Sequence, residues 1–222
     1  MKQFFAALLT AAMVFSATAC TQVNKEFKKL TDDLSSAVKA ECGSSKASKV
    51  QENQFKSNSF DPSSLTFRTG AYYTCEKKDV KVSDLGSKVV EAGDFTDIYM
   101  FCKSSDDSYI LAQVTALKKE GMATDYFEEL VSDLGSDMTE ENLEQMKEAY
   151  GIDYGFSESD NEYAVVLRQE ESDIAEYIYI KVDGKVVTAW LYEGSYSDAL
   201  LSEYNAVMER MDFIDMEALV KE

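Results

Sequence analysis

The first regular pattern of apolar and polar positions runs from Lys25 to Glu41. Apolar residues recur there every three or four positions, namely Phe27, Leu30, Leu34, Ala37 and Val38. This is the spacing of one face of an α-helix, and Gly43 follows as a typical stop signal. The pattern predicts an N-terminal amphipathic helix that packs through one face.

Two later stretches each contain two short apolar runs followed by a helical pattern. The first has strand-like runs from Asp97 to Lys103 and from Tyr109 to Leu117. The helix after them carries apolar residues on one side: Phe127, Leu130, Val131 and Leu134. The second has runs from Ile174 to Val182 and from Lys185 to Tyr192. Its helix carries Leu200, Leu201, Tyr204, Val207, Met208 and Met211. These patterns predict two tandem strand–strand–helix units.

Between the two units the sequence predicts a further helix, from Thr139 to Tyr150, and a strand, from Tyr163 to Arg168. The order of elements is therefore strands, helices, strands and helix. This order favours an antiparallel sheet with helices packed on one face, so the predicted fold class is α+β.

The second pair of strands sorts its side chains into two unlike faces. If Asp183-Gly184 forms a two-residue type I′ turn, Val182 lies opposite Lys185, and Tyr177 lies opposite Trp190. One face is then aliphatic. The other carries Tyr177, Tyr179, Lys181, Thr188, Trp190 and Tyr192.

Large amphipathic aromatic side chains are typical of recognition surfaces. We therefore predict that one sheet face binds a ligand through Tyr177, Tyr179, Trp190 and Tyr192. The alternative is that another strand layer, the N-terminal arm or a neighbouring helix covers this face and makes it part of the core.

The start of the chain has the three parts of a secretory signal. Lys2 supplies positive charge, Phe4 to Ser16 form an apolar run of 13 residues, and Ala17-Thr18-Ala19 is a small-residue cleavage site. A helix that spans a bilayer needs about 20 apolar residues. Residues 1–19 are therefore predicted to be a signal peptide that is removed.

Cys20 follows the small residues Ala17-Thr18-Ala19 directly. This junction resembles the lipobox of bacterial lipoproteins, and the resemblance implies that Cys20 becomes the acylated first residue, anchored in the lipid bilayer outside the cytoplasm. Position 17 departs from the family, which usually has Leu, Val or Ile there. Ala17 and Ala19 also satisfy the rule for ordinary secretion. In that alternative the protein is secreted, and Cys20 is one half of a disulfide.

Cleavage leaves residues 20–64, the predicted N-terminal helix with a polar, serine-rich linker, and residues 65–222, the predicted α+β domain. Without Lys2 the chain has 21 basic and 41 acidic residues, a formal charge of −20. Such a surface repels phosphate backbones, which excludes nucleic acid as a partner, and it favours cationic partners. Membrane contact is then expected through the lipid alone.

Three further cysteines remain, Cys42, Cys75 and Cys102. Cys75 and Cys102 both lie in strand-like runs, so they are the preferred disulfide pair. The alternative is that all three are buried thiols that act as small apolar side chains.

Candidate chemistry is limited by the absence of histidine from the sequence. Histidine-dependent nucleophilic triads and histidine-ligated metals are excluded. No glycine pattern fits a phosphate-binding loop, and no cysteine pair has the spacing of a zinc site. Ser36-Ala37-Val38-Lys39 matches one motif of penicillin-recognising enzymes, but the companion motifs are absent. No catalytic residue, metal or cofactor is therefore predicted.

Two classes of function fit these observations. The favoured class is a non-catalytic exported protein that binds a protein, a peptide or a cell-wall component. The alternative is an extracytoplasmic hydrolase that uses carboxylates, or a serine without histidine. A flat exposed aromatic sheet would favour the binding protein, and a concave pocket with converging acids would favour the hydrolase.

Overall fold

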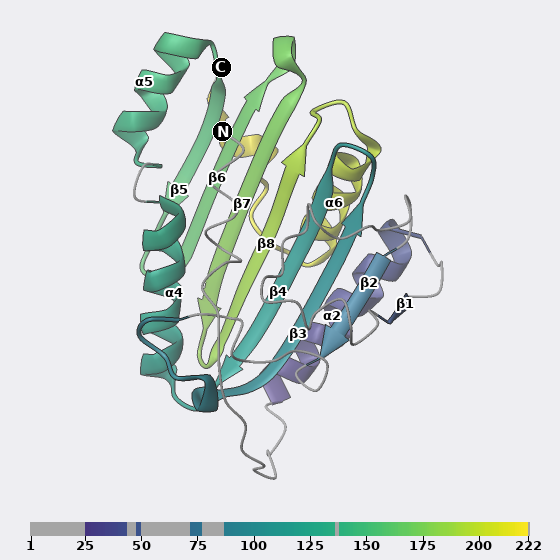
Figure 1. Cartoon of the computed structure of the whole chain (residues 1–222), viewed down its shortest axis with the longest axis vertical. Coiled ribbons are helices and arrows are strands. Elements are labelled where there is room, and N and C mark those ends of the chain that lie inside the picture. Colours follow the sequence, from purple (N-terminus) through teal and green to yellow (C-terminus); the bar gives the residue numbers. More distant parts are fainter. Residues whose placement is uncertain (1–24, 44–47, 50–71, 77–86, 136–137, 222) are drawn as a thin grey trace.

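The centre of the molecule is one β-sheet, shown in Figure 1, a computed structural model that describes residues 25–43, 48–49, 72–76, 87–135 and 138–221. Its strands in chain order are β1 (Ser48–Lys49), β2 (Tyr72–Glu76), β3 (Phe95–Ser104), β4 (Tyr109–Leu117), β5 (Asp153–Glu158), β6 (Glu162–Gln169), β7 (Ile174–Asp183), β8 (Val186–Gly194) and β9 (Val220–Lys221). The helices are α2 (Lys25–Glu41), α4 (Glu120–Gly135), α5 (Glu140–Tyr150) and α6 (Ala199–Arg210).

The nine described strands are ordered β1-β2-β3-β4-β8-β7-β6-β5-β9 across the sheet. The pair β1–β2 is parallel, and the neighbouring pairs from β2 to β9 are antiparallel. The α+β class and the antiparallel character of the sheet are therefore confirmed. The predicted signal peptide, Cys20 and most of the predicted linker lie outside the described residues.

The helices cover both faces of the sheet, so the prediction that they pack on one face is wrong. On one face α4 packs on β4, β7 and β8, and α5 packs on β5. On the other face α2 and α6 contact each other and β4. Figure 1 shows α2 and α6 behind the strands and α4 with α5 along the opposite side. The physical reason is that both faces of the central strands carry large apolar side chains, and each face needs a cover.

Helix α2 is part of this core and has the bounds that the sequence predicts. Phe27, Leu34, Ala37 and Val38 are buried against the sheet and α6. The helix begins beside the β7–β8 turn, where a Cβ built on Gly184 would lie 3.4 Å from Oε2 of Glu26. The helix of the 20–64 segment therefore belongs structurally to the sheet domain.

The two predicted strand–strand–helix units are present as β3-β4-α4 and β7-β8-α6. Their helices lie on opposite faces of the sheet, because α4 joins one buried cluster and α6 joins the other. The units are therefore similar in element order and different in packing.

The register of the β7–β8 hairpin differs from the predicted one by two residues. Asp183 lies opposite Val186, and Tyr179 lies opposite Trp190. The turn is Gly184-Lys185, and Gly184 alone of these two has a positive φ, at 54°. A shift of two residues leaves every side chain on the same face, so the predicted separation into aliphatic and aromatic faces is correct although the pairing is wrong.

The aromatic face is buried, so its predicted exposure is wrong. Tyr177, Tyr179, Trp190 and Tyr192 are each 0% exposed. Trp190 stacks on Phe101 of β3 with ring centroids 5.9 Å apart and on Tyr204 of α6 with centroids 5.8 Å apart. The apolar side of α6 needs a partner of its own, and the aromatic face supplies it. A neighbouring helix thus covers these side chains.

None of the helices in the described parts of the chain is long and apolar enough to cross a bilayer.

Candidate binding groove

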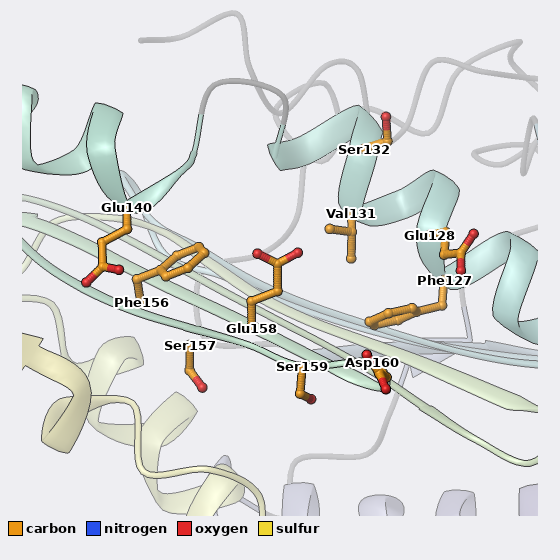
Figure 2. A pocket seen from close by; sticks show the side chains of 10 residues that line it. All are labelled: Phe127, Glu128, Val131, Ser132, Glu140, Phe156, Ser157, Glu158, Ser159 and Asp160. Atoms are coloured by element: carbon orange, nitrogen blue, oxygen red, sulfur yellow. The ribbon is translucent and has the colours of Figure 1, made fainter.

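An open groove of about 870 Å³ lies between α4, the start of α5 and the end of β5 with the turn that follows it. Figure 2 shows the ten side chains that line it. They are Phe127, Glu128, Val131 and Ser132 from α4, Glu140 from α5, and Phe156, Ser157, Glu158, Ser159 and Asp160 from β5 and its turn. The groove therefore joins three elements that follow one another in the chain.

The floor of the groove is apolar. Phe127 is buried, and the half-buried side chains of Val131 and Phe156 pack beside it on the same cluster. Phe156 is held in place by an edge-to-face contact with Tyr163, with ring centroids 5.9 Å apart. In Figure 2 the Glu158 carboxylate rises between Phe156 and Val131. A ligand in the groove would therefore meet apolar surface and carboxylate oxygen together.

The rim of the groove is acidic. Among the described residues, its lining includes Glu128, Glu140, Glu158 and Asp160 and no basic residue. Within the described part of the chain, Glu128, Glu158 and Asp160 form no ion pair. All three are exposed. Because no described basic residue pairs with them, we expect their charges to be available to a ligand.

A second hollow of about 600 Å³ continues the acidic surface along α5. It shares Glu140 with the groove and adds Glu141, Glu144, Gln145, Glu148 and Tyr154. The Tyr154 hydroxyl donates a hydrogen bond of 2.5 Å to Glu144 Oε2, which ties α5 to β5. The acidic surface thus extends over both helices that border β5.

The start of α5 is set by a side-chain cap. The Oγ1 atom of Thr139 accepts a hydrogen bond of 3.3 Å from the backbone N–H of Asn142. The helix ends at Gly151, whose φ of 65° is left-handed and whose N–H donates to the Lys147 carbonyl. Buried Leu143 fixes the helix on the core. These contacts place Glu140 at the groove.

Replacement of Thr139 by alanine is expected to lower the free energy of unfolding by about 1 kcal/mol, because an N-terminal N–H group of α5 loses its acceptor. Urea unfolding followed by circular dichroism measures this change. Thr139→Ser keeps the hydroxyl and serves as the control. A loss of equal size in both variants would show that the methyl group of Thr139, rather than the cap, supplies the stability.

The groove brings exposed carboxylates and apolar side chains together. No cluster of potential metal ligands occurs among the residues searched, which are the described ones. Burial raises the pKa of Tyr163, and the nearby charge of Glu158 raises the pKa further, so this phenol stays protonated. Exposed carboxylates beside aromatic rings attract cations through both charge and the ring faces.

The other residues predicted to form sites lie elsewhere. Tyr177, Tyr179, Trp190 and Tyr192 are in the opposite buried cluster and do not reach the groove. Cys20 lies outside the described residues, so its acylation stays a prediction.

The proposed disulfide also stays a prediction, and the strand register does not favour it. Cys75 lies opposite Met100, whereas Cys102 lies opposite Tyr73. The two cysteines are thus diagonal neighbours, which are typically about 7–8 Å apart. Disulfides usually need Cα atoms within about 6.8 Å of each other. Cys42 and Cys102 are both buried, and burial, with a smaller effect of the Glu203 charge, raises the pKa of Cys42 to about 12.

A separate pair of carboxyl groups lies within the sheet. Glu176 on β7 is directly opposite Glu193 on β8, and Tyr109 on β4 is opposite Glu193 on its other side. The Tyr109 hydroxyl donates a hydrogen bond to Glu193. Glu176 is only 6% exposed. Burial, followed by the charge of Glu193, raises the pKa of Glu176 from 4.5 to about 7.

Comparisons with known proteins identify no family. No protein-family model and no curated protein match the chain. Among solved structures, the extracellular domain of PknH from Mycobacterium tuberculosis is similar with a TM-score of 0.38 and 13% sequence identity. The match covers 87% of this chain and 99% of that chain. A similarity of this degree carries no argument about function.

Proposed function

We propose that this protein is an exported, non-catalytic binding protein whose groove between α4, α5 and β5 holds a cationic ligand. The observation that carries the proposal is the lining of the groove, which combines four carboxylates with an apolar floor and, among the residues that the structure describes, has no basic residue. The export part of the proposal rests on the signal sequence of residues 1–19 and the lipobox-like Cys20.

The groove offers a lysine or arginine side chain two favourable environments. The alkyl stem of such a side chain packs on apolar surface, such as Phe156 and Val131, while its charged end stays near solvent. The charged end then meets the carboxylates of Glu128 and Glu158. The net negative charge of the whole chain also increases the rate at which cations arrive.

The alternative of a carboxylate hydrolase has one observation in its favour, since the groove is concave and several acids line it. A general acid that stays protonated near neutral pH needs burial, however, to disfavour its charged form. Glu128, Glu158 and Asp160 are exposed and form no ion pair with other described residues. This arrangement supports binding more strongly than acid catalysis.

The test is isothermal titration calorimetry of the chain from residue 20 onward with spermine and with a short lysine-containing peptide. We expect both to bind, and we expect binding to weaken with salt, because the screening length falls from about 10 Å at 0.1 M to about 3 Å at 1 M. Glu128→Gln, Glu158→Gln and Asp160→Asn combined should weaken binding about tenfold. Each exposed ion pair contributes roughly 0.2–1 kcal/mol, and about 1.4 kcal/mol is tenfold in affinity.

A matched control removes the same charge elsewhere. Asp107, Glu171 and Glu209 are also exposed, and the groove does not include them. Their combined amide variant keeps the net charge of the groove variant and should bind as the wild type does. Equal loss in the two triple variants would assign binding to the overall charge rather than to the groove. If neither spermine nor the lysine-containing peptide binds, the proposal is wrong.

A further inference from the structure

We infer that the cationic ligand is an extended basic peptide segment that joins the sheet as an additional strand along the open edge of β5. This inference rests on the proposed function, because it names the chemical class of ligand that the same groove would hold.

The outer edge of β5 is only partly paired. On its inner side β5 pairs with β6 along its whole length, from Asp153 to Glu158. On its outer side β9 pairs with Tyr154 and Gly155 only. Leu219, the last residue of the 3₁₀-helix η5 (Glu217–Leu219), follows on the same side and lies against Gly155. Among the described residues, Ser157 and Glu158 therefore have no strand on their outer side. An unpaired strand edge is a template for a further strand.

The hydrogen-bond pattern shows which backbone groups point outward. The N–H of Ser159 donates a hydrogen bond of 2.8 Å to the carbonyl of Glu162, so this pair is hydrogen-bonded across the hairpin. In an antiparallel pair, hydrogen-bonded and non-hydrogen-bonded positions alternate. The N–H and C=O groups of Phe156 and Glu158 therefore point away from β6. The β5–β9 register places Leu219 beside Phe156, so Glu158 is the one of these two residues that faces the open end of the edge. The backbone groups of Tyr154 point outward in the same way, and Tyr154 pairs with Lys221 of β9 on that side.

The open edge and the acidic groove are formed by the same residues. Phe156 and Glu158 line the groove, and both side chains lie on the sheet face that α4 covers. A strand added beside β5 would point every second side chain into the groove. One such side chain would lie beside Glu158 and the next beside Phe156.

The arrangement therefore specifies a simple pattern in the ligand. A basic residue beside Glu158 would have Glu128 and Asp160 nearby in the groove lining, and an apolar residue two positions away would contact Phe156. Main-chain hydrogen bonds would supply affinity, and the two side chains would supply specificity, as in other cases of strand addition. Charge complementarity thus selects a basic peptide as the occupant.

The experiment uses the chain from residue 20 onward and the capped peptide Lys-Ser-Val-Ser-Lys-Ser-Val-Ser, which alternates lysine and valine on one face. A second peptide has the same sequence with every backbone amide N-methylated. It keeps the charged side chains and loses the backbone N–H donors along both edges of the peptide strand. We expect the methylated peptide to bind at least about tenfold more weakly, since several hydrogen bonds are lost. Spermine, which has no peptide backbone, provides the comparison for charge alone.

Amide hydrogen exchange followed by NMR locates the binding edge. With the unmodified peptide, exchange at the amide of Glu158 should slow at least about tenfold, because its outward N–H gains a partner. Spermine should leave this amide unchanged. The amide of Lys185, in the β7–β8 turn, should be unaffected by either ligand.

The outcomes separate this inference from the proposed function. If spermine and both peptides bind equally, and exchange at Glu158 does not slow, the groove binds cations without strand addition and the inference is wrong. If none of the three ligands binds, the proposed function fails and the inference fails with it. Acidic residues at a strand edge can also serve only to prevent pairing with other chains. In that case none of the three ligands would bind.

Discussion

Replacement of Trp190 by alanine is expected to lower the free energy of unfolding by about 3–5 kcal/mol. The indole is fully buried and stacks between Phe101 on β3 and Tyr204 on α6. Its removal leaves a cavity between the sheet and α6 that these neighbours cannot fill without moving. Urea unfolding followed by circular dichroism measures the loss.

The control for this variant is Tyr150→Ala, because Tyr150 is an aromatic residue that is 66% exposed. Its replacement should change stability by only about 0.5 kcal/mol. Trp190→Ala should still bind spermine under conditions where it is folded, since Trp190 is not part of the groove. Little loss of stability combined with loss of binding would instead make Trp190 a surface recognition residue.

Replacement of Glu176 by glutamine is expected to stabilise the protein at neutral and alkaline pH and to have little effect in acid. Below about pH 4.5 the wild-type carboxyl is protonated in both the folded and the unfolded chain, so its ionisation contributes nothing. Above about pH 7 it is ionised in both states, and folding places the charge in a buried site beside Glu193. The stability of the wild type should therefore fall as pH rises through this window.

The size of the effect follows from the change in pKa. A change from 4.5 to about 7 corresponds to roughly 3 kcal/mol at 1.36 kcal/mol for each pH unit. Urea unfolding of wild type and Glu176→Gln at pH values below, within and above the window measures the difference. Glu171→Gln, at an exposed position, should leave the pH dependence unchanged. A parallel pH dependence for wild type and Glu176→Gln would show that Glu176 does not cause the slope.

The parts of the fold that follow from the sequence are those with one strong periodic pattern. Helix α2 and strand β4 have the predicted bounds. The amphipathic pattern of α2 fits a helix and the continuous apolar run of β4 fits a buried strand, and neither pattern fits another conformation well. Strand β5 was not predicted. Its alternation has only two apolar positions, Tyr154 and Phe156, before Glu158, and its conformation depends on pairing with β6.

What covers a sheet face is set by residues far away in the chain. The hairpin sequence alone separates the aromatic from the aliphatic side chains, but it does not show that α6 returns to cover Tyr177 and Trp190. The groove also depends on how separate elements pack, since its carboxylates come from α4, α5, β5 and the β5–β6 turn. Among 41 acidic residues, no local spacing distinguishes these four.

The position of α2 fixes how far the molecule could move from a membrane. If Cys20 is acylated, only five peptide units separate the anchor from Lys25, and a fully extended chain of that length reaches about 18 Å. The start of α2 lies against the β7–β8 turn, and a hydrogen bond of 2.9 Å from the Val182 N–H to the Asn161 carbonyl joins that turn to the one beside the groove. The start of α2 and the groove thus share one end of the sheet and lie on its opposite faces. A protein held in this way would sample peptides presented close to the membrane surface, and more distant ligands would have to come to it.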